Sequence, residues 1–176
     1  MRVYITDLEA YNNGHLVGSW YELPMREEEL AQAIQNELHK GQKICKHTHL
    51  HEEYFISDFE CDYLKIDEYD SLTTLNETAQ KIEILEIQEK TAVKLMLENY
   101  IVNSIDEAIE NLDNMICTGE SKMEDIAYKY IEESRALQNM PESLQGYFDY
   151  EAFGRDMEIE GSYFKDGDGI LWKYVE

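Results

Sequence analysis

Apolar positions in the first sixty residues come in short runs that are bounded by turn residues, as β-strands are. Residues 3–8 and 16–23 are two such runs, and we predict that they pair as a hairpin. The Asn13-Gly14 dipeptide between them favours a tight turn, because both residues tolerate positive φ. Pro24 is expected to end the second strand, since it has no backbone N–H to donate.

A helical repeat follows the hairpin. Apolar residues from Leu30 to Leu38 recur at four-residue spacing, acidic residues occupy the first turn and Gly41 comes after, so we predict a helix over residues 26–40. Residues 54–59 then return to a strand pattern. The first sixty residues therefore predict a β-hairpin, a helix and a third strand.

The middle of the chain has helical periodicity, which ends near Pro141. Ser104 and Ser121 each precede a glutamate by three positions, the capping-box pattern in which hydroxyl and carboxylate satisfy backbone donors. The predicted helices cover residues 71–85, 90–100, 105–112 and 123–131.

Helical and strand patterns are mixed in the C-terminal stretch. Residues 147–157 are aromatic and expected to be partly helical, and residues 163–164 and 170–175 predict a second hairpin around the turn at 166–169. β-rich, all-helical and mixed segments thus follow one another, which indicates an α+β fold with two or three small domains in a row.

Charge changes this picture, because 38 acidic and only 15 basic residues give a formal net charge of −23. Residues 52–110 alone carry −12, against −2 before them and −9 after them. Such a field repels nucleic acid and anionic membranes and attracts basic protein surfaces. Solubility or adaptation to high salt are simpler explanations. Three widely spaced cysteines and the lack of an apolar run of spanning length lead us to expect a cytoplasmic protein.

The acidic residues of segment 52–110 are the candidate partner-binding surface, and we call them the acidic set. Apolar residues at regular spacing between them indicate a folded scaffold rather than a disordered tail. The sixteen members are Glu52, Glu53, Asp58, Glu60, Asp62, Asp67, Glu68, Asp70, Glu77, Glu83, Glu86, Glu89, Glu98, Asp106, Glu107 and Glu110.

Catalytic motifs are missing from the sequence. The nine glycines never form a phosphate-binding loop. The zinc-protease pattern that begins at His51 lacks its second histidine, because Phe55 stands there. A calcium loop that placed Gly169 at its invariant glycine would need Phe164 and Val175 as ligands. We therefore predict no enzyme activity and no cofactor.

One candidate metal site consists of Cys45, His47, His49 and His51. Alternate residues of a strand face the same way, so these ligands could share a face suited to zinc or nickel. Ligands spaced by two along one flat strand diverge, however. We expect exposed histidines in a loop or edge strand and no bound metal, with a histidine metalloenzyme as the alternative.

An aromatic cluster is the last candidate site. Tyr147, Phe148, Tyr150 and Phe153 could line a ligand site. In a small domain such residues more often form core or a self-association surface, and we favour that interpretation.

The number of carboxylates can be compared with DNA. A B-form duplex carries one phosphate charge per roughly 1.7 Å, so 38 carboxylates match about 19 base pairs, or about 65 Å of duplex. A compact chain of this length has a radius of gyration of only about 16 Å, so a duplex-like charge track requires an extended arrangement. One hypothesis is a protein that occupies the basic DNA channel of a nucleic-acid enzyme. The alternative is an acidic partner or chaperone of a basic DNA-binding protein.

Five blocks of sequence, spread over nearly the whole chain, resemble the ArdA family of antirestriction proteins, which plasmids and conjugative transposons carry. The segment 45–49 is not part of that pattern. The blocks are residues 3–14 (VYITDLEAYNNG), 18–20 (GSW), 51–60 (HEEYFISDFE), 97–108 (beginning LEN and ending EA) and 147–156 (YFDYEAFGRD).

The resemblance implies more than the charge does. Members of this family look like B-form DNA in shape and charge, are elongated, have three domains, form homodimers and block type I restriction-modification enzymes by occupying their DNA-binding groove. Carried over, residues 97–110 fall on the family's antirestriction motif and the acidic set falls on its mimic surface. The dimer contact is expected in the C-terminal domain, at the aromatic cluster. The expected domains are 1–61 (N-terminal, β-rich), 62–112 (central, helical) and 113–176 (C-terminal, α+β).

Overall fold

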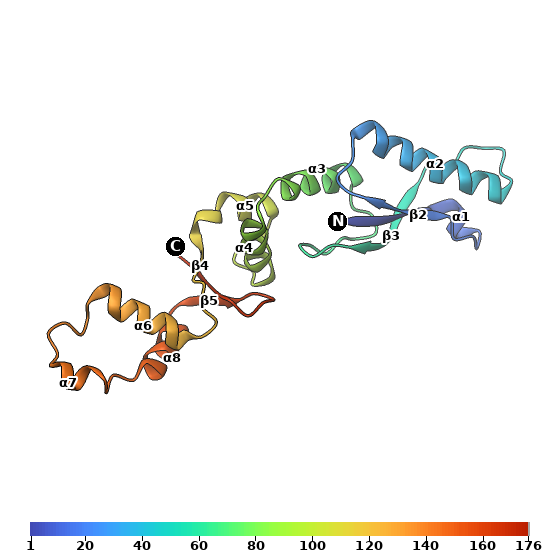
Figure 1. Ribbon diagram of the computed structural model, residues 1–176. Helices are drawn as coiled ribbons and strands as arrows, with labels where there is room; N and C mark the ends of the chain where they lie inside the picture. The colour runs from blue at the N-terminus through green and yellow to red at the C-terminus, as the bar shows by residue number, and fades with distance from the viewer. Residues whose placement is uncertain (176) are drawn as a thin grey trace. The chain divides into compact units, whose positions relative to one another are not determined.

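A computed structural model describes residues 1–175, and the chain divides into two compact units, Met1–Glu86 and Ile87–Glu176. Both units combine helices with one small antiparallel sheet (Figure 1), which confirms the predicted α+β class. The division into three domains and the elongated arrangement stay predictions. In the part of the chain that the structure describes, no helix is long and apolar enough to cross a membrane.

The first unit is a three-stranded antiparallel sheet with α2 packed on it. The sheet has the order β2-β1-β3, so β1 is central, with Val3 opposite Tyr21 on one side and Phe59 on the other. The elements are β1 (Arg2–Asp7), α1 (Leu8–Asn12), β2 (Gly18–Glu22), α2 (Glu27–Cys45), β3 (Tyr54–Glu60) and α3 (Leu72–Glu83).

Apolar residues from the sheet, α2 and α3 share one core. Burial of each large apolar side chain stabilises the fold by about 1.5–3 kcal/mol. This stabilisation offsets the repulsion among the surface charges. The core residues are Val3, Ile5, Leu23, Leu30, Ile56, Ile66, Leu72, Leu75 and Ala79.

The connection between the strands of the first hairpin is longer than the pattern predicted. β1 ends at Asp7, whose side chain accepts a 2.6 Å hydrogen bond from the Ala10 amide and so begins α1. Leu8 therefore lies in a helix and not in the strand. Gly14 still makes the turn, with φ of +83°. β1 and β2 pair as predicted, but the connection contains a short helix instead of a two-residue turn.

The helix predicted over residues 26–40 is also longer, because α2 runs on to Cys45. Gly41 lies inside it, buried against the side chain of Asp7. The helix ends instead at Lys46, which adopts a left-handed conformation with φ of 56°. Gly41 is thus a packing residue, and the prediction that it stops the helix is wrong.

The second unit has a three-stranded antiparallel sheet of order β4-β6-β5 and two groups of helices. Helices α4 and α5 pack on each other, and α6 packs along α8. The elements are α4 (Ile87–Glu98), α5 (Ile105–Glu110), the 3-10 turn η1 (Leu112–Asn114), β4 (Met115–Cys117), α6 (Met123–Ser134), α7 (Glu142–Gln145), α8 (Tyr150–Glu160), β5 (Ser162–Lys165) and β6 (Leu171–Tyr174).

The C-terminal hairpin is confirmed, with Phe164 opposite Trp172 and the turn at Asp166–Gly169. The Asp166 carboxylate accepts hydrogen bonds from the Ile170 amide and the Trp172 indole, at 2.8 Å each. These contacts make the segment a turn of the kind that the sequence predicts.

Two local predictions for this unit are wrong. Ser121 does not cap α6, since Lys122 is the residue before the helix and makes no side-chain cap. The three-residue strand β4 was not predicted. It is too short to show a period, and it exists because Met115 pairs with Tyr174, far along the chain.

Candidate functional site

The acidic set lies at the protein surface. Fourteen of its sixteen members are exposed, and Asp70 and Glu89 are half-buried. They project from β3, α3, α4, α5, the loops between these elements and the loop before β3, and so belong to both units. The scaffold therefore holds most of these carboxylates in water, as the sequence predicted, and their role as a partner-binding surface stays a prediction.

Helical periodicity is what turns the acids outward. In α3 the buried side chains include Leu72, Leu75 and Ile82, while Glu77 and Glu83 are exposed. Ser71 begins this helix by accepting a hydrogen bond from the Thr74 amide. A helix with one apolar stripe must place its remaining side chains in water, so burial of the stripe orients the carboxylates.

The segment 97–110 consists of the end of α4, the loop that follows it and α5. α4 ends where Tyr100 adopts φ of 55°, and the Asn99 side chain donates a 2.8 Å hydrogen bond to the Leu95 carbonyl. After a short loop, Ser104 begins α5 by accepting from the Glu107 amide at 3.2 Å. The loop between α4 and α5 is thus held at both ends by hydrogen bonds at the helix termini.

The same segment separates apolar from acidic side chains. Val102, Ile105 and Ala108 are buried in the second unit. The acidic members of the segment, Glu98, Asp106, Glu107 and Glu110, are exposed. Glu107 has a structural task as well, since its carboxylate accepts a 2.8 Å hydrogen bond from the Asn103 amide. The predicted Ser104 cap is confirmed, but the glutamate reaches Asn103 and not the Ser104 amide.

The excess of negative charge is shared almost equally between the units. Residues 1–86 contain 18 acidic and 7 basic residues, a net charge of −11, and residues 87–176 contain 20 and 8, a net charge of −12. Some acids of the set have a cationic neighbour. Arg2 donates two 2.6 Å hydrogen bonds to Glu60, which hold the pKa of that carboxyl below its usual value, and Lys94 lies 3.8 Å from Glu98. The field of each unit nevertheless stays strongly negative.

Two carboxylates outside the acidic set are fully buried, those of Asp7 and Glu37. Glu37, on α2, receives hydrogen bonds from Lys40 at 2.7 Å and from the Tyr21 hydroxyl. Burial raises the pKa of Glu37, but these two hydrogen bonds, a third from Ser19 and the charge of Lys40 together outweigh burial, so its pKa is below the usual value. Its place on the buried face of α2, next to Leu38, is the sequence signal for a structural carboxylate.

The histidines of the candidate metal site do not lie on a strand. Cys45 ends α2, and His47, His49 and His51 lie in the loop before β3. The three imidazoles nevertheless converge on Glu9 of α1, and the ligand atoms of Glu9 and the three histidines all lie within 4.8 Å of one another. Cys45 is not part of this group. The expectation of exposed histidines holds for His49 and is wrong for His47, which is half-buried, and for His51, which is 5% exposed.

Two pKa values in this region depart from their ordinary values. The hydrogen bond to His49 lowers the pKa of Glu9. Burial, together with the charges of Asp7 and Glu9, raises the pKa of the Cys45 thiol. The carboxylate therefore stays charged and the thiol protonated at neutral pH.

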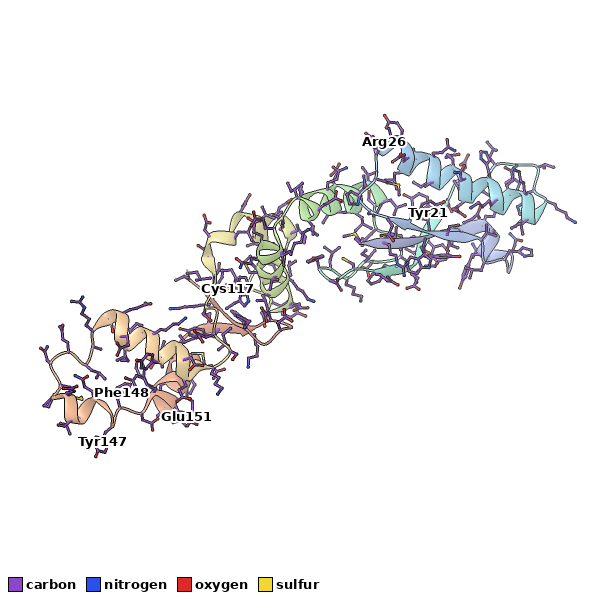
Figure 2. All side chains as sticks on the ribbon, in the orientation of Figure 1. Tyr21, Arg26, Cys117, Tyr147, Phe148 and Glu151 are labelled. Atoms are coloured by element: carbon purple, nitrogen blue, oxygen red, sulfur yellow. The ribbon has the colours of Figure 1, made fainter. Side chains whose placement is uncertain are left out.

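The four aromatic residues proposed for self-association have unequal exposure. Phe148, Tyr150 and Phe153 are half-buried, and the Phe148 ring contacts the other two, with ring centroids 4.9 Å apart for Tyr150 and 5.6 Å apart for Phe153. Tyr147 is 84% exposed and points outward from the loop after α7 (Figure 2).

Helix α6 adds two tyrosines to this aromatic cluster. Tyr128 packs on Tyr150 at 5.2 Å and Tyr130 on Phe153 at 6.0 Å, and both α6 tyrosines remain about half exposed. The cluster therefore joins α6 to α8 and leaves aromatic surface free.

Comparison with known proteins gives one family. The model of the family described as Antirestriction protein (ArdA) matches residues 3–171. The match extends over most of both units and includes the whole acidic set. No curated protein sequence matched the chain.

Proposed function

The chain belongs to the ArdA family of antirestriction proteins, and from this premise we propose that it inhibits type I restriction-modification enzymes by occupying their DNA-binding groove. In this proposal the protein is a mimic of B-form DNA that acts by binding alone, in the cytoplasm, and binds neither nucleic acid nor membrane itself.

The exposure of most of the acidic set is the observation that carries the proposal. A folded scaffold holds fourteen of the sixteen carboxylates exposed and two half-buried, and the net charges of the two units are −11 and −12. A basic groove that binds DNA gains much of its affinity by exchanging small counterions for phosphates. Carboxylates on a rigid surface can replace the phosphates in this exchange, so the inhibitor and the duplex compete for one groove.

Two further parts of the proposal concern assembly. The domains 1–61, 62–112 and 113–176 would follow one another in an elongated arrangement, so that the carboxylates form a track of duplex length. Two chains would associate through the aromatic cluster around Tyr147, which offers exposed rings. A homodimer would double the length of the charge track.

A competition experiment tests the proposal. A type I restriction-modification enzyme is incubated with a labelled duplex that contains its recognition site, and the protein is added at 50 and at 200 mM salt. We expect the protein to displace the duplex stoichiometrically and to block cleavage. Its affinity should fall at least about tenfold between the two salt concentrations, because the interaction is electrostatic.

The same experiment separates the alternative function. An acidic partner of a basic DNA-binding protein would bind such a protein and leave the duplex on the restriction enzyme. Failure to displace the duplex at 50 mM salt would therefore reject the DNA-mimic proposal.

A further inference from the structure

The loop between α2 and β3 is fixed at both of its ends, to α2 at its start and to α1 at its end. At its start the His47 amide donates a 3.1 Å hydrogen bond to the Gln42 carbonyl, and at its end the Leu8 amide donates a 3.0 Å hydrogen bond to the Glu53 carbonyl. Three of the five histidines of the chain lie in the eight residues of this loop, 46–53. The loop thereby brings three imidazoles to one side chain of α1, that of Glu9.

The distances among these side chains fit a tetrahedral metal site. With metal–nitrogen bonds of about 2.0–2.1 Å, neighbouring ligand atoms of a tetrahedron lie about 3.3 Å apart. His47 Nδ1 lies 2.9 Å from His51 Nε2 and 3.0 Å from Glu9 Oε1. His49 Nε2 lies 2.7 Å from Glu9 Oε1, and His51 Nε2 lies 3.5 Å from Glu9 Oε2. One ion among the four ligand atoms would need only small adjustments of the side chains.

A buried carboxylate orients one of the imidazoles. His51 Nδ1 lies 2.6 Å from Asp7 Oδ2, and both side chains are fully buried. Because a carboxylate only accepts hydrogen bonds, Nδ1 donates to Asp7, which leaves Nε2, on the side of His47 and Glu9, as the nitrogen that can bind a metal. A carboxylate that holds the second ring nitrogen of a ligating histidine is the usual arrangement around zinc.

From this geometry we propose that Glu9, His47, His49 and His51 bind one divalent transition-metal ion, with zinc the best match. Three imidazoles and one carboxylate suit zinc, and four protein ligands leave no open position, as in structural and not catalytic sites. His49, with a side chain that is 60% exposed, forms the entrance for the ion. A dication also reduces the negative charge of the first unit, which repels itself.

The site has a consequence for the acidic surface. The metal would hold the loop that carries Glu52 and Glu53, two members of the acidic set, against α1. The metal would thereby fix the position of the loop and of these two members of the acidic set. The inference does not depend on the proposed function, because its test measures the metal and not inhibition.

Metal content and metal affinity test the inference. The chain is prepared without a histidine tag, stripped with a chelator and titrated with Zn²⁺. We expect one ion per chain, a thermal midpoint that rises with zinc, and the absorption bands of tetrahedral coordination when Co²⁺ replaces Zn²⁺. The double variant His47→Ala with His49→Ala should bind zinc at least about 100-fold more weakly.

A matched control uses the two remaining histidines. His15 and His39 are exposed and lie outside the site, so the double variant His15→Ala with His39→Ala should bind zinc like the parent. The single variant His49→Ala removes only the most exposed ring, and its zinc affinity should still fall at least about tenfold. Equal zinc binding by the parent and by both site variants, or no zinc uptake by the stripped parent, would overturn the inference.

Discussion

Gly41 of α2 packs directly on the buried carboxylate of Asp7, so closely that a Cβ at Gly41 would overlap Asp7 Oδ2. Both carboxylate oxygens of Asp7 are hydrogen-bonded, because Oδ1 accepts from the Ala10 amide at the start of α1 and Oδ2 accepts from His51 Nδ1. The glycine is therefore required by the close approach of helix and carboxylate and not by its backbone conformation.

Gly41→Ala should destabilise the protein although Gly41 lies inside a helix. Alanine favours the helix by about 0.5–1 kcal/mol, but the overlap with a carboxylate that cannot move costs more, about 1–3 kcal/mol or above. We expect a net loss of stability in urea denaturation.

The control for this variant is Gly146→Ala. Gly146 follows α7 with φ of −67°, and no atom lies within 4 Å of the position that its Cβ would occupy. This substitution should be neutral or slightly stabilising. Equal effects of the two substitutions would show that the packing of Gly41 on Asp7 is not what limits position 41.

Asp166→Asn should weaken the C-terminal hairpin in a pH-dependent way. Burial raises the pKa of Asp166, but hydrogen bonds from the Trp172 indole and from backbone amides outweigh it and hold the pKa below its usual value. Asparagine offers one acceptor oxygen where the carboxylate offers two, so the indole or the turn amides lose a partner, at a cost of about 1–3 kcal/mol.

The direction of the pH effect follows from the lowered pKa. The carboxylate contributes its stability above the pKa of the unfolded chain, and that contribution is lost as pH falls through the folded pKa. The difference in unfolding free energy between parent and Asp166→Asn should thus be full at pH 7 and shrink on acidification below about pH 4. The exposed neighbour Asp168 provides the control, since Asp168→Asn should cost little at any pH.

Neutralising three acids of the 97–110 segment should weaken inhibition more than any single change. The variant carries Glu98→Gln, Asp106→Asn and Glu107→Gln, the last of which keeps an oxygen for the Asn103 amide. Each exposed carboxylate contributes little alone, so single variants should stay within about threefold of the parent. The triple variant should lose at least about tenfold in inhibitory affinity, measured by duplex displacement.

A second triple variant controls for net charge. Glu132→Gln, Glu133→Gln and Glu158→Gln remove the same charge from exposed positions of the same unit, outside the acidic set. If this variant loses as much affinity as the first one, then total charge and not the 97–110 segment determines inhibition.

Tyr147→Ser should weaken self-association without unfolding the chain. Tyr147 is 84% exposed, so the free monomer loses little packing, whereas a tyrosine in the centre of an interface contributes about 1–2 kcal/mol or more. Sedimentation should show a dimer dissociation constant at least about tenfold higher. Tyr69→Ser, at a position that is 72% exposed in the first unit, is the control and should leave association unchanged.

Local patterns were enough to predict most of the helices and the outward position of the acidic set. Leu72, Leu75 and Ile82 repeat with the helical period, and a side chain off that stripe must be solvated. The same reasoning found the Ser104 cap and the C-terminal turn at Asp166, whose partners lie within a few residues. These features depend on residues that are close together in the chain, so their interactions can be read from the sequence.

What only the tertiary structure decided depends on residues that are far apart in the chain. Asp7 meets His51 across 44 positions and Glu9 meets His49 across 40, so the spacing of the histidines alone indicated divergence where the folded loop makes them converge. Gly41 looked like a helix stop because the residue packed against it stands in β1. Composition, charge and membership of an antirestriction family were thus contained in the sequence, while the grouping of side chains around Asp7 required the fold, since contact across the chain has no local signal.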